Sequence, residues 1–107
     1  MSARGNAAVD YAHLKVQAAD DLDVMREVLQ LFVVHTEQLM TELAHASDVR
    51  TWKQIAHSLK GSARGVGAFT LAEAAADAEL APLDKSKITA LNAAFSEARV
   101  FISKNPM

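Results

Sequence analysis

Apolar side chains recur at helical spacing from Leu22 to Leu43, and this pattern constrains the fold more than any other feature of the chain. An α-helix turns once in about 3.6 residues, so these positions fall on one side of a single long helix. They are Leu22, Met25, Leu29, Phe32, Thr36, Leu39, Met40 and Leu43. Asp20 or Asp21 is a suitable N-cap for this helix, and Ser47 with Asp48 interrupts it. Its apolar side must be covered by other helices.

Four further helices are predicted from periodicity and from breaking residues. They run from about Asp10 to Ala18, from about Asp48 to the region of Gly65 and Gly67, from Ala68 or Thr70 to Leu80, and from about Asp84 to Ser103. Thr70 and Glu73 have the spacing of a capping box at the start of the fourth of the five helices. Pro82 marks the break before the last helix.

The length and composition of the chain favour one all-α domain. The chain has 107 residues, half of them hydrophobic, with only four Gly and two Pro. We predict an antiparallel four-helix bundle with a short additional N-terminal helix, because four substantial helices are joined by short connections. Residues 1–107 then form a single domain, with its core at about residues 20–103 and a flexible segment at residues 1–9.

His57 lies on a helix whose apolar side does not include it. The apolar side consists of Trp52, Ile55, Ala56, Leu59, Ala63 and Val66. On a helical wheel His57 is roughly 140° from Trp52, which places the imidazole toward solvent. Lys53, Lys60, Gly61 and Arg64 share the sector of the imidazole. The helix therefore presents a histidine among cations, where an anionic group could be accommodated.

A lone histidine on a helix is usually an ordinary surface residue, so the neighbours of His57 decide its interpretation. Gly61 leaves open the space over the ring that a side chain one turn ahead would cover. A glycine inside a helix costs about 1 kcal/mol relative to alanine, which favours a use such as the close approach of a partner. Lys60 lies within reach of a group bonded to the ring and could partly neutralise a phosphoryl group. Lys53 and Arg64 are either ordinary solvated cations or contacts to an acidic partner.

Several other chemistries are poorly supported by the sequence. Cys is absent, which removes thiolate catalysis and suits a reducing compartment such as the cytoplasm. The positions three and four residues on either side of His57 offer no metal-ligand pair, and neither Ser58 nor Ser62 is oriented to form a nucleophilic pair with His57. The net charge of −2 argues against nucleic acid as the main partner. No apolar stretch approaches the ~20 residues that a membrane span needs.

Residues 56–68, AHSLKGSARGVGA, resemble the signature of histidine-containing phosphotransfer (HPt) domains. The residues in register are His57, Leu59, Lys60, Gly61, Ser62, Ala63, Val66, Gly67 and Ala68, followed by Leu71. The resemblance extends more weakly back to Leu31 and Phe32 and forward to Glu79, so it covers roughly residues 20–80. Ala78 departs from the family, which often has Leu at this position, and this puts local packing in doubt more than phosphotransfer.

The resemblance implies a phosphoryl carrier of a phosphorelay. His57 would accept the phosphoryl group, Lys60 would stabilise it, and Gly61 would clear the approach of a receiver domain. Arg64, Lys53 and Ser58 are candidates for contact with that partner. The partners would be the receiver domain of a hybrid histidine kinase and that of a response regulator. The protein is expected to be a cytoplasmic monomer without a cofactor of its own, to lack kinase activity, and to rely on Mg²⁺ bound by the receiver.

Four alternative functions compete with this interpretation. A helical docking module could bind a receiver without being phosphorylated, although His57, Lys60 and Gly61 together weigh against it. The chain could also be the phosphoacceptor domain of a chemotaxis-type kinase, whose histidine helix is similar. A hydrolase with His57 as general base lacks a paired nucleophile or a metal. A helix-turn-helix DNA-binding protein is disfavoured because the acids of its second helix would repel phosphates. Glu73, Asp77 and Glu79 on the following helix could orient the imidazole through its second nitrogen, but the sequence does not fix which of them faces the ring. Ordinary solvated acids are the more common case.

Overall fold

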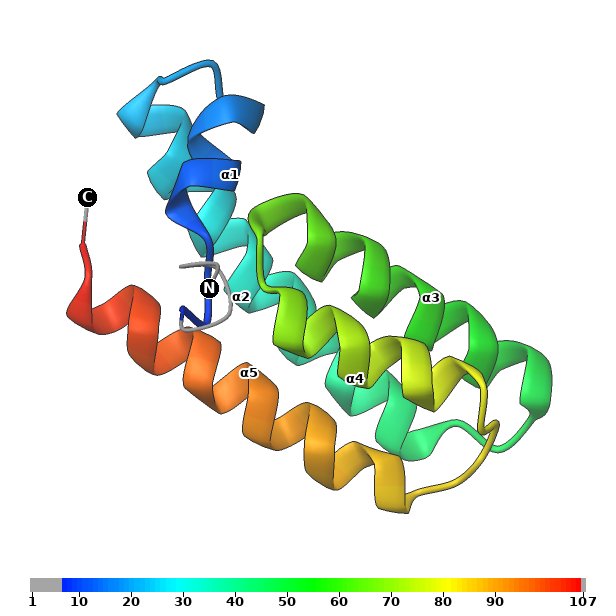
Figure 1. Cartoon of the computed structure of the whole chain (residues 1–107). Helices are drawn as coiled ribbons and strands as arrows, with labels where there is room; N and C mark the ends of the chain where they lie inside the picture. Colours follow the sequence, from blue (N-terminus) through cyan, green and yellow to red (C-terminus); the bar gives the residue numbers. More distant parts are fainter. Residues whose placement is uncertain (1–6, 107) are drawn as a thin grey trace.

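The computed structural model describes residues 7–106, and these residues form five α-helices and no strand (Figure 1). The helices are α1 (Tyr11–Gln17), α2 (Leu22–His45), α3 (Val49–Val66), α4 (Phe69–Glu79) and α5 (Ser86–Lys104). The all-α class predicted from the sequence is confirmed. Within the described range, no helix is long and apolar enough to cross a membrane.

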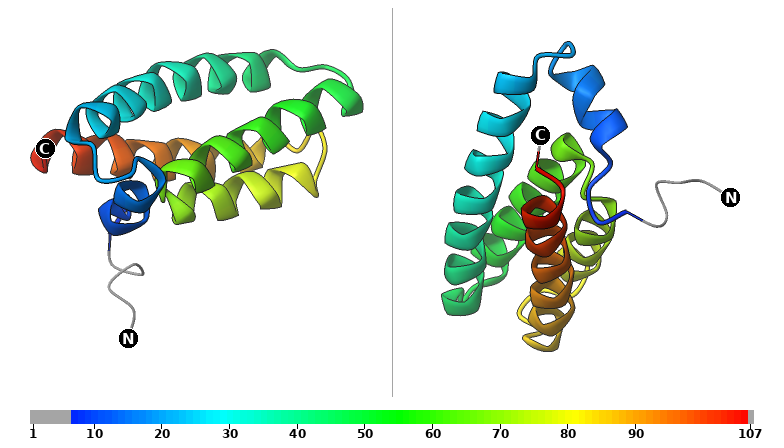
Figure 2. Two further views of the ribbon diagram at one scale, coloured as in Figure 1. Left: turned by 90° about the horizontal axis from the view of Figure 1, so that it is seen from above. Right: turned by 90° about the vertical axis from the view of Figure 1, so that its left-hand side faces the viewer.

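The four longer helices lie side by side around a common core. Helix α3 packs against α2 and α4, and α5 packs against α4 and α2, so the contacts close a ring. Figure 2 shows these helices from two further directions, with α1 at one end against α2 and α3. The backbone N–H of Asp10 donates to the carbonyl oxygen of Gly67 at 2.9 Å, which ties the start of α1 to the turn between α3 and α4.

Aspartate side chains cap the first three helices, and for α2 the sequence predicted this role for Asp20 or Asp21. The carboxylate of Asp21 accepts from the backbone N–H groups of Asp23 and Val24 at 3.0 and 3.2 Å. Asp48 and Asp10 cap α3 and α1 in the same way. These bonds satisfy N–H groups that have no partner inside a helix, and each such cap typically stabilises a helix by about 1 kcal/mol.

The capping box predicted for α4 was wrong, although the helix begins within the predicted range of Ala68 or Thr70. Thr70 and Glu73 form no capping box, because α4 begins at Phe69 and its N-cap is Ala68, which makes no side-chain cap bond. The turn that precedes α4 explains where the helix begins. Gly67 adopts a left-handed φ of +81°, and Ala68 is completely buried, so packing of the turn sets the start of the helix. Helix α5 begins at Ser86, close to the predicted start at about Asp84, and the carboxylate of Asp84 accepts from the backbone N–H and hydroxyl of Ser86.

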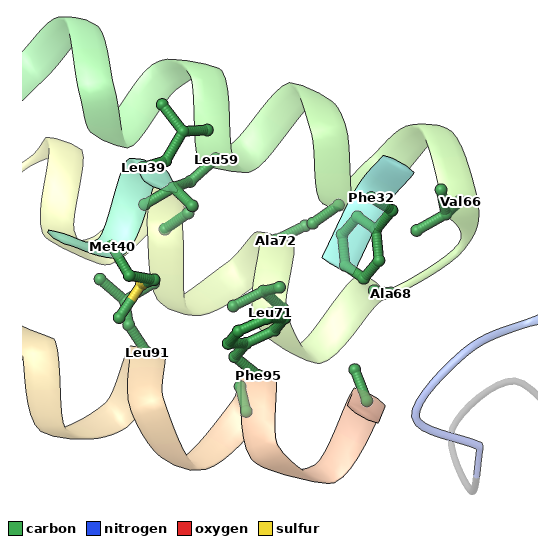
Figure 3. Packing of buried hydrophobic residues seen from close by; sticks show 14 of the residues in the cluster. Phe32, Leu39, Met40, Leu59, Val66, Ala68, Leu71, Ala72, Leu91 and Phe95 are labelled. Atoms are coloured by element: carbon green, nitrogen blue, oxygen red, sulfur yellow. The ribbon is translucent and has the colours of Figure 1, made fainter. Parts of the chain in front are cut away.

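The core follows the predicted helix faces closely. All six residues assigned to the apolar side of α3 are buried, and seven of the eight assigned to α2 are buried. Leu22 is the exception, with about half of its surface exposed, because it stands at the first position of α2. Side chains from α2, α3, α4 and α5 meet in this core (Figure 3). The rings of Phe32 and Phe95 pack edge to face, with their centroids 6.3 Å apart.

The core also includes residues that precede the predicted range of 20–103. Val9 and Leu14 are both buried, with 0% and 1% of their surface exposed. Leu14 brings α1 onto the core, and Val9 lies within the segment 1–9 that was expected to be flexible. Residues 1–6 of that segment lie outside the described residues. The N-terminal segment thus covers one end of the helical core from Val9 onward.

Lys85 closes the other end of α2 by an interaction that the sequence did not reveal. Its ammonium donates to the carbonyl oxygens of Ala44 and Ala46 at 2.9 and 3.1 Å, and it lies 3.5 Å from that of Leu43. The last carbonyl groups of a helix lack internal donors, and a cation there also complements the helix dipole.

We expect Lys85→Met to lower the free energy of unfolding by about 1–2 kcal/mol, because the carbonyl groups of α2 lose a charged donor. Urea unfolding followed by circular dichroism measures the loss. Lys87→Met removes the same charge from α5, at a residue that lines the groove between α4 and α5. An equal loss in both variants would contradict the capping role of Lys85.

Candidate functional site

The imidazole of His57 stands on the outer side of α3, with 69% of its side chain exposed. The neighbouring core positions Ala56 and Leu59 are buried, so the helical period itself turns His57 outward. Lys60, one turn further along, has 20% of its side chain exposed and extends across the surface of the protein. The sequence prediction of an outward-facing histidine beside a lysine therefore agrees with the placement of both side chains.

Glu79 joins these two side chains. One carboxylate oxygen, Oε2, lies 3.2 Å from Nδ1 of His57, and the other, Oε1, accepts from Nζ of Lys60 at 2.7 Å. Glu79 is the last residue of α4, so the bridge links the middle of α3 to the end of the next helix. Of the three acids that the sequence left open, only Glu79 contacts the ring. Glu73 and Asp77 instead line a shallow groove between α4 and α5.

The bridge determines which ring nitrogen carries the proton. An ionised carboxylate only accepts hydrogen bonds, so His57 Nδ1 must donate its N–H to Glu79. In the neutral ring, Nε2 is then the nitrogen with a free lone pair. The site thus holds an exposed imidazole in the form that can attack an electrophile through Nε2.

Contact with Lys60 keeps the carboxyl group of Glu79 ionised. The hydrogen bond and the charge of Lys60 hold the pKa of Glu79 below its ordinary value, and the hydrogen bond of His57 adds to the effect, against partial desolvation. A group whose pKa is lower in the folded state stabilises the fold above its ordinary pKa. That contribution disappears as the pH falls through the folded value.

We expect Glu79→Gln to reduce stability at neutral pH by on the order of 1 kcal/mol or less, because the pair is at the surface. The difference from wild type should shrink between neutral pH and a strongly acidic pH that lies below the lowered pKa of Glu79, where the wild-type carboxyl is protonated as well. Urea unfolding of both proteins at the two pH values tests this. A difference that persists in acid would show that Glu79 acts through packing rather than through charge.

Gly61 leaves the surface beside His57 open. A Cβ atom built at this position meets no heavy atom within 4 Å, and the residue is exposed inside α3. The fold therefore does not itself require glycine here by packing. Lys53, Ser58 and Arg64 are also exposed on α3. Their placement agrees with the sequence, and their contact with a partner stays a prediction.

A metal centre finds no support at this site. Among residues 7–106, no group of three or more His, Cys, Asp or Glu side chains is arranged to hold a metal ion. His45 is occupied elsewhere, since its Nδ1 lies 2.8 Å from the carbonyl oxygen of Thr41. What the site offers is one nucleophilic ring nitrogen, one ammonium group and an open surface.

Comparison with known proteins identifies a family. Residues 12–100 match a family model described as Hpt domain, and this range contains every residue of the site. It extends at both ends beyond the range of residues 20–80 over which the sequence resemblance was visible. No match was found among curated proteins or among solved structures.

Proposed function

Because the chain belongs to the Hpt domain family, we propose that it is a histidine phosphotransfer protein of a two-component phosphorelay in which His57 carries the phosphoryl group. The observation that carries this proposal is the bridge from Glu79 to both His57 and Lys60. It combines a nucleophile of defined tautomer with a cation for the incoming charge, on a surface that a second protein can reach.

The chemical step is attack by His57 Nε2 on the phosphorus of a receiver's aspartyl phosphate. The N–P bond forms as the bond from phosphorus to the aspartyl oxygen breaks, and the aspartate leaves as a carboxylate. The proton on Nδ1 stays in place, so the ring gains positive charge, which Glu79 stabilises across 3.2 Å. Transfer to a second receiver is the same step in reverse, with the aspartate oxygen as nucleophile.

Lys60 can serve the phosphoryl group without releasing Glu79. An ammonium group has three N–H donors, and the contact at 2.7 Å to Glu79 uses one of them. A second donor can contact a phosphoryl oxygen on His57, one helical turn away. Lys60 thereby offsets negative charge, and Glu79 keeps the ammonium group from swinging into solvent.

The same proposal extends to the arrangement of the helices and to the partners. We propose an antiparallel four-helix bundle with α1 as an additional N-terminal helix, supported by the ring of contacts among α2, α3, α4 and α5. The partners would be receiver domains of a hybrid histidine kinase and of a response regulator, with Mg²⁺ held by the receiver. We further propose a cytoplasmic monomer that carries no cofactor, lacks kinase activity and binds neither nucleic acid nor membrane.

The test is incubation of the purified protein with receiver domains carrying a ³²P-labelled aspartyl phosphate. The proposal expects label on the protein that is stable in alkali and labile in acid, as a phosphoramidate is, and loss of label from the receiver. Binding to a receiver without any transfer of label would overturn the proposal in favour of a docking module. Label that appears from ATP without a receiver would also overturn the proposed absence of kinase activity.

A further inference from the structure

Glu79 lies at the end of α4, where the sequence lacks the residues that usually stabilise the end of a helix. It is the last residue of α4, whose C-cap is Leu80 in a right-handed conformation rather than a glycine, and the last turn contains no basic residue. The turn that follows α4 donates backbone N–H groups to the carbonyl oxygens of Ala76 and Ala78, both at 3.2 Å, and helix ends held by few other contacts fray readily. The carboxylate that contacts His57 therefore depends on contacts from outside α4 for a fixed position.

Trp52 supplies such a contact from α3. Its side chain is completely buried, and the indole Nε1–H donates to the carbonyl oxygen of Ala78 at 2.7 Å. Ala78 directly precedes Glu79 and is itself fully buried. The ammonium of Lys85 lies 5.5 Å from the centre of the indole ring, so the ring is held between the core and the segment that follows α4.

We propose that Trp52 is a positioning residue for phosphoryl transfer, which acts by fixing the last turn of α4 so that Glu79 bridges His57 and Lys60. The inference rests on the proposed function and assigns to it a residue that touches neither the ring nor the phosphoryl group. Trp52 and His57 belong to the same helix, five positions apart. Helix α3 thus positions both partners of the His57–Glu79 contact. It carries the imidazole itself, and it holds the carboxylate in place through the hydrogen bond of the indole to Ala78.

A purely structural role for Trp52 predicts a different result. If Trp52 only fills the core, its shape matters and its N–H group does not. Loss of the N–H with the ring kept in place would then leave His57 unchanged. The two roles are separable because the chain contains a single tryptophan, so replacement of all tryptophan in the protein alters position 52 alone.

The experiment produces the full chain with the benzothiophene analogue of tryptophan, in which sulfur replaces the indole N–H. Nitrogen-15 NMR of the His57 ring reports the tautomer without any phosphoryl donor. Transfer from a labelled receiver gives the rate, and thermal unfolding gives the stability. Phe95→Leu, a core change on α5 away from Glu79, is the matched control for destabilisation alone.

We expect the wild-type ring to be protonated on Nδ1, and the analogue to shift toward the Nε2–H form with transfer slowed about three- to tenfold. Phe95→Leu should unfold more easily and keep both the tautomer and the rate. An unchanged tautomer in the analogue would overturn the positioning role, whatever its rate. Failure of the wild type to take up label would reject the proposed function, and the NMR comparison would still decide whether Trp52 positions Glu79.

Discussion

His57→Gln is expected to abolish phosphoryl uptake from a labelled receiver, a loss of more than about a thousandfold, with little change in stability. Glutamine has no nucleophilic ring nitrogen, but its amide group can still donate a hydrogen bond toward Glu79. Because 69% of the His57 side chain is exposed, its replacement should change the free energy of unfolding by only about 0.5 kcal/mol. Autoradiography gives the uptake, and urea unfolding gives the stability.

His45→Gln is the matched control for this experiment. His45 is an exposed histidine at the end of α2, and its ring contacts a backbone carbonyl rather than a carboxylate. The control should take up label at the wild-type rate. Equal labelling of the His57 variant would place the phosphoryl group on another residue, and a large loss of helicity would show that His57 supports the fold.

The placement of His57 could be predicted from the sequence because helical periodicity alone decides it. Within α3, each position is related to the next by a fixed rotation, so one recognised apolar side fixes the outward side as well. Trp52, Ile55 and Leu59 are buried, and His57 and Gly61 are exposed, all as predicted. No information about the neighbouring helices was needed for this result.

The partner of His57 could not be predicted in the same way. Which acid of α4 meets the ring depends on where the helix begins and on how it is rotated against α3. The sequence left the start open between Ala68 and Thr70, and the buried turn at Gly67 and Ala68 fixes it at Phe69. Glu79 stood in the sequence as one of three acids, and only the packed arrangement distinguishes it.

Hydrogen bonds between residues far apart in the chain, inside the core or across it, could not be predicted from the sequence either. Trp52 was recognised as a core residue, but its hydrogen bond to Ala78 spans 26 positions, and Lys85 reaches α2 across about 40. No short-range pattern reports such pairs. A single tryptophan and a lysine just before a helix become informative only when the folded structure shows which helix ends need hydrogen-bond donors.

Gly61→Leu is expected to separate the stability of the fold from its function more sharply than any other substitution. A Cβ atom at this position meets no heavy atom within 4 Å, and leucine favours a helix over glycine by about 0.5–1 kcal/mol. The variant should therefore unfold at a higher urea concentration than wild type. The leucine side chain leans toward the preceding turn and covers the ring, so transfer should fall by about ten- to a hundredfold.

Gly65→Leu provides the matched comparison. Gly65 is also exposed inside α3 and equally free of neighbours, so the gain in helix stability should be the same. It lies two turns from His57, where a side chain does not reach the ring. We expect this variant to gain stability and to keep most of its transfer rate, measured at limiting receiver concentration.

If both variants transferred at the wild-type rate, open access over His57 would not be needed, and glycine at position 61 would have no role in docking. If both slowed equally, the contact surface of the receiver would extend along α3 at least as far as Gly65.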